Sequence, residues 1–157
     1  MKRLLVIACL SCATALSVPA VAGAQQPIYP TRVAPASFTA KTTPSRDRTR
    51  PYKFKTTGAV GIPAVLPLIC PPGATTLAYC VKPPVAFVCS GSVTVTFKKG
   101  FITVSSKTVA LAPNCTYSSS ATFKAKKKPG KLSVRVAFSG NLLLNGASAP
   151  NQTVRGG

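Results

Sequence analysis

Strict alternation of apolar and polar side chains is the feature that most constrains the fold of this chain. In the segment "CSGSVTVTFKK", small or apolar residues alternate with Ser, Thr or Lys at every step from Cys89 to Lys98. Successive side chains of a strand point to opposite faces, so this pattern predicts a strand with one buried face. Its buried face would hold Cys89, Gly91, Val93, Val95 and Phe97.

A hairpin turn is predicted at Lys98-Lys99-Gly100, where Gly100 can adopt a positive φ. The segment "FITVS" then returns beside the first strand. Its apolar residues Ile102 and Val104 have even numbers, whereas Val109 and Leu111 have odd numbers. A bulge or a break into two strands must absorb this change of parity.

Three further tracts alternate in the same way, and a last strand is predicted over about residues 149–155. The tract that starts at Tyr52 carries Lys53 and Lys55 and stops at Gly58, which predicts a strand at a sheet edge. Short strands separated by turn residues predict an all-β, Ig-like antiparallel β-sandwich over residues 52–157. The predicted inward residues are Tyr52, Phe54 and Thr56; Cys115, Tyr117, Ser119, Ala121 and Phe123; and Leu132, Val134, Val136 and Phe138.

Two segments do not fit a strand pattern. Residues 61–88 contain six prolines, which rule out a central strand and predict an elaborated loop inserted into the sandwich. Residues 25–51 are rich in Pro and Thr, are basic, and have no sustained apolar period. We interpret them as a disordered linker.

The first 24 residues have the composition of a signal peptide. Lys2 and Arg3 precede an apolar run, and Ala22-Gly23-Ala24 fits a peptidase site before Gln25. An uncleaved membrane anchor is the alternative, but the apolar run is short for a spanning helix. We therefore expect a secreted or extracellular protein, with association with the cell surface as a second option.

Four cysteines remain after removal of the leader: Cys70, Cys80, Cys89 and Cys115. An even number in an exported chain predicts two disulfides, for which three pairings exist. Cys70 and Cys80 enclose a short loop, and Cys89 and Cys115 begin two inward-facing tracts, so we favour 70–80 and 89–115. Zinc is the weaker alternative, since the chain has no His and these four cysteines have no C-x₂-C spacing.

Charge is the most unusual property of the composition. Without Lys2 and Arg3 the chain keeps 18 of its 20 basic side chains against Asp47 alone, a net charge of about +17. The absence of Glu and His removes paired carboxylates, Ser-His-Asp triads and Cys-His pairs. A Ser–Lys dyad is the only familiar nucleophilic arrangement left. We expect no enzyme, no cofactor, no metal and no small-molecule substrate.

Two basic clusters are the candidate binding residues for a polyanion. One lies before and within the first tract, and the other surrounds the predicted turn at Pro129-Gly130. Anionic polymers of a cell envelope are the expected partner, with only non-specific attraction for nucleic acid. The candidate residues are Arg46, Arg48, Arg50, Lys53, Lys55, Lys124, Lys126, Lys127, Lys128 and Lys131.

The same basic residues also fit simpler roles. The lysines around Pro129 would also serve simply to solubilise a turn, and the basic segment 46–55 would serve as a charged spacer. A cationic effector that attacks membranes or binds nucleic acid is the alternative function. A disulfide-closed lobe at 70–80, with Leu77 and Tyr79 at its tip, is a further candidate surface, although we expect it to cover the end of the sandwich.

The segments "CSGSVTVTFKKG", "NCTYSSSATFK" and "KLSVRVAFSGN" resemble Ig-like repeat modules of secreted actinobacterial proteins. The shared features are the cysteine that opens a strand, the C-x-Y after the next loop, and the V-x-F-x-G-N tract. The resemblance covers about residues 52–156 and implies an extracellular structural or adhesive unit without a cofactor. This chain departs from such proteins in having one copy and the proline-rich insertion at 61–88.

Overall fold

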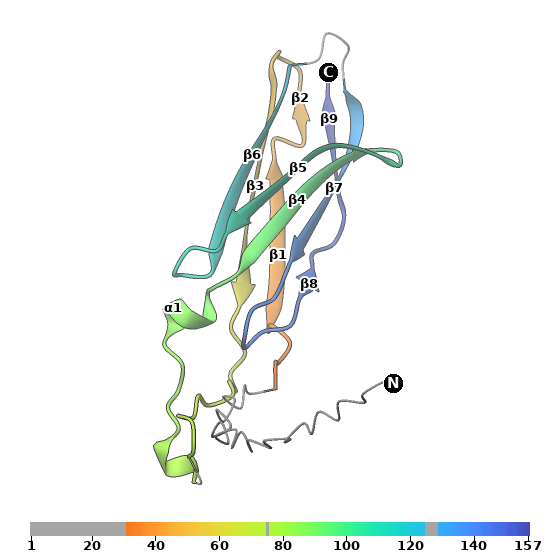
Figure 1. Ribbon diagram of the computed structural model, residues 1–157. Coiled ribbons are helices and arrows are strands. Elements are labelled where there is room, and N and C mark those ends of the chain that lie inside the picture. The colour runs from red at the N-terminus through yellow and green to blue at the C-terminus, as the bar shows by residue number, and fades with distance from the viewer. Residues whose placement is uncertain (1–30, 75, 125–128) are drawn as a thin grey trace, which may run out of the picture.

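The computed structural model describes residues 31–157, except 75 and 125–128. Nearly all of its regular structure is β (Figure 1). The strands are β1 (Ser37–Thr43), β2 (Arg46–Asp47), β3 (Tyr52–Gly61), β4 (Ser92–Lys99), β5 (Ile102–Ala110), β6 (Thr116–Phe123), β7 (Gly130–Phe138), β8 (Ala147–Ser148) and β9 (Gln152–Gly156). Two short helices, η1 (Leu77–Tyr79) and α1 (Val85–Val88), lie between β3 and β4.

The strands form two sheets, which Figure 1 shows as two layers. The first sheet has the order β1-β3-β6, with antiparallel pairing throughout. The second has the order β2-β9-β7-β4-β5, with β8 beside β7. Its pairs are antiparallel except that β2 runs parallel to β9.

One hydrophobic core lies between the two sheets. The predicted inward residues of the alternating tracts are buried, apart from Gly91, which is exposed, and Phe123, which is half buried. The rings of Phe54, Phe97 and Phe123 join the sheets at centroid distances of 5.5–6.1 Å. Buried polar groups are paired, since the Thr42 and Thr56 hydroxyl oxygens lie 2.9 Å apart.

The predicted change of parity is a β-bulge. Phe97 pairs with Ser105 and Lys98 pairs with Thr103, so Val104 is the extra residue in β5. β5 therefore stays one continuous strand. The predicted hairpin also forms, with Gly100 at a φ of 60°. The predicted last strand corresponds to β9, which begins at Gln152 after Pro150, and the short β8 before it was not predicted.

The linker prediction is wrong for residues 37–47, which form β1 and β2. Phe38, Ala40 and Thr42 face inward on β1, but such small and polar residues give a weak apolar signal. β1 is stabilised by its pairing with β3 from Ser37–Gly61 to Thr43–Lys55. The folded part of the chain thus begins well before residue 52.

The prediction of an edge strand at 52–57 is also wrong. β3 is the central strand of its sheet, between β1 and β6, and it continues through Gly58 to Gly61. Lys53 and Lys55 point to solvent from the outer face of the sheet rather than protecting an edge. Gly58 is required because Tyr117 on β6 crosses over it, and the Tyr117 hydroxyl donates a 2.9 Å hydrogen bond to the carbonyl oxygen of Thr39.

Both favoured disulfides form, Cys70–Cys80 and Cys89–Cys115. Cys89 lies shortly before β4, which begins at Ser92, and Cys115 lies directly before β6, which begins at Thr116. The second disulfide therefore joins one strand of each sheet at the same end of the core, where both of its cysteines are buried.

The V-x-F-x-G-N tract ends β7 with a polar anchor. The Asn141 side-chain amide donates to the carbonyl oxygens of Val88 and Ser90, both at 2.8 Å. Its carbonyl oxygen accepts from the backbone N–H groups of Leu143 and Leu144 at 2.8 and 2.7 Å. One side chain thereby fixes the loop after β7 to the segment before β4.

Candidate functional site: a basic surface

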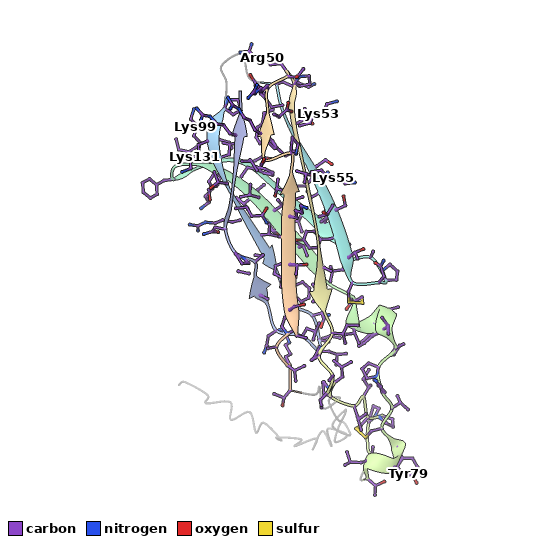
Figure 2. All side chains as sticks on the ribbon, turned by 180° about the vertical axis from the view of Figure 1, so that it is seen from behind. Arg50, Lys53, Lys55, Tyr79, Lys99 and Lys131 are labelled. Carbon is purple, nitrogen blue, oxygen red and sulfur yellow. A yellow bond between two sulfur atoms is a disulfide. The ribbon has the colours of Figure 1, made fainter. Side chains whose placement is uncertain are left out.

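Of the predicted basic residues that the structure describes, Figure 2 labels Arg50, Lys53 and Lys131 toward one end of the molecule, with the unpredicted Lys99 at the same end. Seven of the ten candidates lie in the described part of the chain, and each of them is exposed. Lys126, Lys127 and Lys128 lie outside the described residues. The register of the strands then decides which cations become neighbours.

Asp47, the one acidic side chain of the sequence, is used to shape the β2–β3 loop. Its carboxylate accepts hydrogen bonds from the backbone N–H groups of Lys53 at 2.7 Å and Thr49 at 3.0 Å. These two bonds, with a smaller effect of the Lys53 charge, hold the pKa of Asp47 below its ordinary value. The loop so formed presents Arg48 and Arg50 to solvent.

Lysines and hydroxyl groups cover the outer face of the three-stranded sheet. Lys53 and Lys55 of β3 alternate with buried neighbours and pair with Thr122 and Ser120 of β6. Lys55 also pairs with Thr43 of β1. Lys41, two residues before Thr43 on the same strand, lies on the same outer face. Lys41 was not among the predicted residues, because it stands alone in the sequence.

The outer face of the six-stranded sheet carries a row of three cations. Arg46 of β2 pairs with Arg155 of β9, and Arg155 pairs with Lys131 of β7. Paired residues of neighbouring strands point to the same face with Cβ atoms about 5 Å apart. Arg46 and Lys131 belong to different predicted clusters, and the unpredicted Arg155 brings them together. We call these three residues the cationic row.

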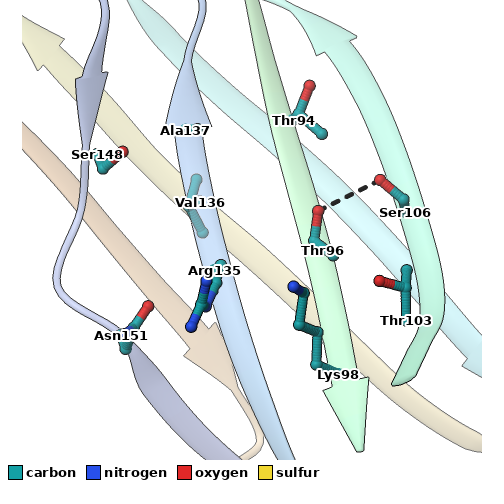
Figure 3. Close-up of a pocket in the computed structure, with 10 residues that line it drawn as sticks. All are labelled: Thr94, Thr96, Lys98, Thr103, Ser106, Arg135, Val136, Ala137, Ser148 and Asn151. Atoms are coloured by element: carbon teal, nitrogen blue, oxygen red, sulfur yellow. Dashed lines mark hydrogen bonds between the residues drawn. The ribbon is translucent and has the colours of Figure 1, made fainter. Parts of the chain in front are cut away.

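A shallow hollow continues the basic surface across β7, β4 and β5 (Figure 3). Lys98 and Arg135 supply its two cations, and the rest of its polar lining consists mainly of Thr and Ser. Thr96 and Ser106 hydroxyl oxygens lie 3.3 Å apart, and those of Thr94 and Thr108 lie 2.9 Å apart. Cations among hydroxyl donors suit an anionic ligand such as a phosphate, sulfate or carboxylate group.

The described members of the two predicted clusters lie on two faces of the molecule. Lys53 and Lys55 lie on the outer face of one sheet, whereas Arg46 and Lys131 lie on the outer face of the other. Arg48, Arg50 and Lys124 lie in or beside loops at the shared end. The molecule therefore presents cations on two sides of one end, and the cationic row is their closest grouping by register.

Residues 62–74 and 76–84 form an arm that projects from the end of the sheets beyond α1 (Figure 1). The expectation that the 70–80 lobe covers the end of the sandwich is therefore wrong. The disulfide Cys70–Cys80 and two 2.9 Å backbone hydrogen bonds between Ile69 and Val81 close the lobe. Leu77 and Tyr79 at its tip are exposed, and Figure 2 labels Tyr79 at the end far from Arg50.

Among the described residues, no group of three or more His, Cys, Asp or Glu side chains could hold a metal ion. No helix in the same part of the chain is long and apolar enough to span a membrane. The exposed cations and hydroxyl groups of the basic surface offer charge attraction and hydrogen bonding. Comparison with family models, curated proteins and solved structures finds no match to this chain.

Proposed function

We propose that this chain is a secreted, non-catalytic Ig-like β-sandwich that acts as an extracellular or cell-envelope adhesion module. It binds acidic polymers weakly through the basic surface, and the cationic row with Lys98 and Arg135 carries most of that affinity. A spread of exposed cations around an open hollow favours a long, repeating anionic ligand over a small molecule.

The cationic row is the observation that carries this proposal. Like charges directly opposite one another on neighbouring strands destabilise a sheet. Asp47 is the one acidic side chain of the described residues, and its two carboxylate oxygens already accept hydrogen bonds from the backbone N–H groups of Thr49 and Lys53. An anionic group that binds across Arg46, Arg155 and Lys131 would remove this repulsion, so binding and folding would support each other.

The order of the strands supports the Ig-like part of the proposal. β1 pairs with β3 in one sheet, and the chain then crosses so that β2 pairs with β9 in the other. The sheets β1-β3-β6 and β9-β7-β4-β5 correspond to strands A-B-E and G-F-C-C′ of an Ig-like domain. The inter-sheet disulfide differs, since it joins the segments before β4 and β6 rather than β3 and β7.

The two disulfides and the leader composition support secretion. Disulfides persist in oxidising compartments outside the cytosol. The excess of basic over acidic side chains also keeps copies of the protein apart in solution. Both properties suit a protein that works among anionic polymers outside the cell.

Binding over a salt series tests the proposal. The full coding sequence is expressed in an exporting host, and the secreted protein is titrated with a poly(glycerol phosphate) polymer, a uronic-acid polymer and duplex DNA. The variant R46S/R155S/K131S removes the cationic row, and R32S/K82S/K107S removes the same charge from exposed positions elsewhere. We expect R46S/R155S/K131S to bind at least one of the two acidic polymers about tenfold or more weakly than the unmodified protein does. The loss of affinity in R32S/K82S/K107S should be much smaller.

Equal losses in the two variants would contradict the proposal, because they would show that only net charge matters. Loss of all polymer binding at physiological salt in the unmodified protein would also contradict it. Tight binding to DNA alone would favour the nucleic-acid-binding alternative.

A further inference from the structure

The tip of the β4–β5 hairpin is apolar although it is a turn exposed to solvent. Gly100 and Phe101 connect Lys99 to Ile102, which form the last pair of the two strands. The Phe101 side chain is fully exposed, Ile102 is 71 % exposed, and the bulged Val104 is 42 % exposed. Turns of this kind are usually built from polar residues and Gly. Neither the turn geometry nor the core explains these three residues.

Cations lie beside this apolar tip on its β4 and β7 side. Lys98 and Lys99 directly precede the turn, and Lys98 pairs with Ser133 of β7. Lys131 and Arg135 lie two residues to either side of Ser133 on the same outer face. Figure 2 labels Lys99 and Lys131 at the same end of the molecule. An exposed apolar point is thus framed by positive charges from two neighbouring strands.

We propose that the β4–β5 hairpin tip inserts into an anionic lipid membrane. Phe101 and Ile102 would enter the boundary between headgroups and acyl chains, where apolar side chains leave water. Lys98 and Lys99 would lie at the level of the lipid phosphates, with their apolar stems beside the tip. The inference rests on the proposed function, because the basic surface first attracts the protein to an anionic surface.

Shape and charge favour a lipid surface over the other occupants. Figure 1 shows the hairpin protruding beyond its neighbours in the sheet, so a protein partner would need a matching deep groove. A lipid surface deforms around a convex tip. The arm also exposes apolar residues, including Leu77 and Tyr79, but its tip lies far from Arg50 and Lys53. An anionic membrane therefore attracts the basic end of the molecule before it attracts the arm.

The absence of tryptophan from the sequence allows a direct test. Phe101→Trp places the only indole at the hairpin tip, and Tyr79→Trp places it at the tip of the arm as the matched control. Each secreted protein is mixed with vesicles of phosphatidylglycerol, of phosphatidylcholine, and with single-stranded DNA, while Trp emission and vesicle pelleting are recorded. We expect a blue shift for Phe101→Trp with phosphatidylglycerol only, and no shift for Tyr79→Trp.

A second variant measures the contribution of the tip. F101S/I102S replaces two exposed residues, so its urea unfolding midpoint should stay close to that of the unmodified protein. We expect it to need about tenfold or more lipid for half-maximal pelleting, because two apolar side chains no longer leave water. Its affinity for soluble acidic polymers should stay unchanged, since the cationic row is intact.

The outcomes separate the inference from the proposed function. Pelleting with phosphatidylglycerol vesicles without a shift for Phe101→Trp would overturn insertion and leave electrostatic binding in place. A shift for Tyr79→Trp alone would transfer the anchor to the arm and overturn the inference. A shift with single-stranded DNA but not with vesicles would identify base stacking instead. Loss of both polymer binding and pelleting would defeat both proposals together.

Discussion

Asp47 is the only acidic side chain of the sequence, and the structure uses it to hold backbone N–H groups rather than to bind a cation from solution. The two backbone hydrogen bonds lower its pKa from the ordinary value of 3.8. A lowered pKa in the folded state means that the carboxylate stabilises the fold above the unfolded pKa. This contribution is lost as the pH falls through the folded pKa.

For Asp47→Asn we therefore expect a lower urea midpoint than that of the unmodified protein at about pH 6, and a difference that becomes smaller at about pH 2, below the ordinary pKa of 3.8. Urea unfolding followed by circular dichroism at both pH values measures this. Lys53→Gln is the control, because it keeps the backbone N–H that is the first cause of the lowered pKa. A difference that is equal at both pH values would show that ionisation of Asp47 is irrelevant to stability.

Gly58 shows how one residue depends on a distant side chain. An added Cβ at this position would meet the Thr39 carbonyl oxygen and the Tyr117 ring. We expect Gly58→Ala to lower the free energy of unfolding by about 1–3 kcal/mol, the usual effect of overpacking. Ala59→Ser, on the outer face beside it, should change stability by less than about 0.5 kcal/mol. Urea unfolding of both variants checks the contrast, and equal stability of the two would contradict the close approach of Tyr117.

The same residues explain which side-chain roles are readable from sequence. Alternation correctly places Val93, Val95 and Phe97 in the core, because each strand carries its own pattern. Gly58 looks like the end of a strand, since nothing nearby in the sequence indicates that Tyr117 will lie over it. The reason for the glycine is a contact between residues that are far apart in the chain.

At the scale of elements, β1 and β3 show the limit of pattern analysis. The inward face of β1 consists of Phe38, Ala40 and Thr42, and the composition of its surroundings suggests a linker. β3 carries two lysines, and lysine on an outer face gives the same local pattern as lysine on an edge strand. Only the pairing of β1 with β3 distinguishes these cases, and that pairing is not visible in either segment alone.

The two disulfides should differ in their contribution to stability. Cys89–Cys115 joins buried ends of both sheets across 26 residues, so C89A/C115A should lower the free energy of unfolding by about 3 kcal/mol. Cys70–Cys80 closes the lobe of the arm, where no described residue between them is buried. Because that loop gains little order from the core, C70A/C80A should leave the unfolding midpoint nearly unchanged. Similar losses in the two variants, measured by urea unfolding, would show that the arm folds as part of the core.

At the scale of the whole molecule, the candidate site depends on the register of the sheet. The sequence identifies Arg46 and Lys131 as members of two basic clusters because their neighbours are basic. Arg155 and Arg135 have uncharged sequence neighbours, and Lys98 belongs to the hairpin turn with Lys99; all three join the basic surface through strand pairing. Net charge is therefore readable from composition, whereas the grouping of charge requires the order of the strands.

The N-terminal boundary of the fold gives a prediction for the whole molecule. The side chain of Gln152 on β9 connects the two sheets. Its Oε1 accepts from the Thr42 backbone N–H at 2.8 Å, and its Nε2 donates to the Ala40 backbone carbonyl oxygen at 2.7 Å. Phe38 packs against Tyr117 and Phe138 at centroid distances of 5.9 and 6.2 Å. Removal of β1 and β2 would expose this part of the core and leave β3 with one neighbour.

A chain of residues 31–157 should therefore unfold cooperatively in urea. A chain of residues 52–157 should have a free energy of unfolding lower by about 4 kcal/mol or more, and a loss of this size abolishes folding of many small domains. Circular dichroism and the dispersion of amide resonances in nuclear magnetic resonance spectra compare the two chains. Equal unfolding midpoints would show that β1 and β2 add nothing to the core. The expected result would mean that Arg46 belongs to the folded surface, where its register with Arg155 and Lys131 is fixed before any ligand arrives.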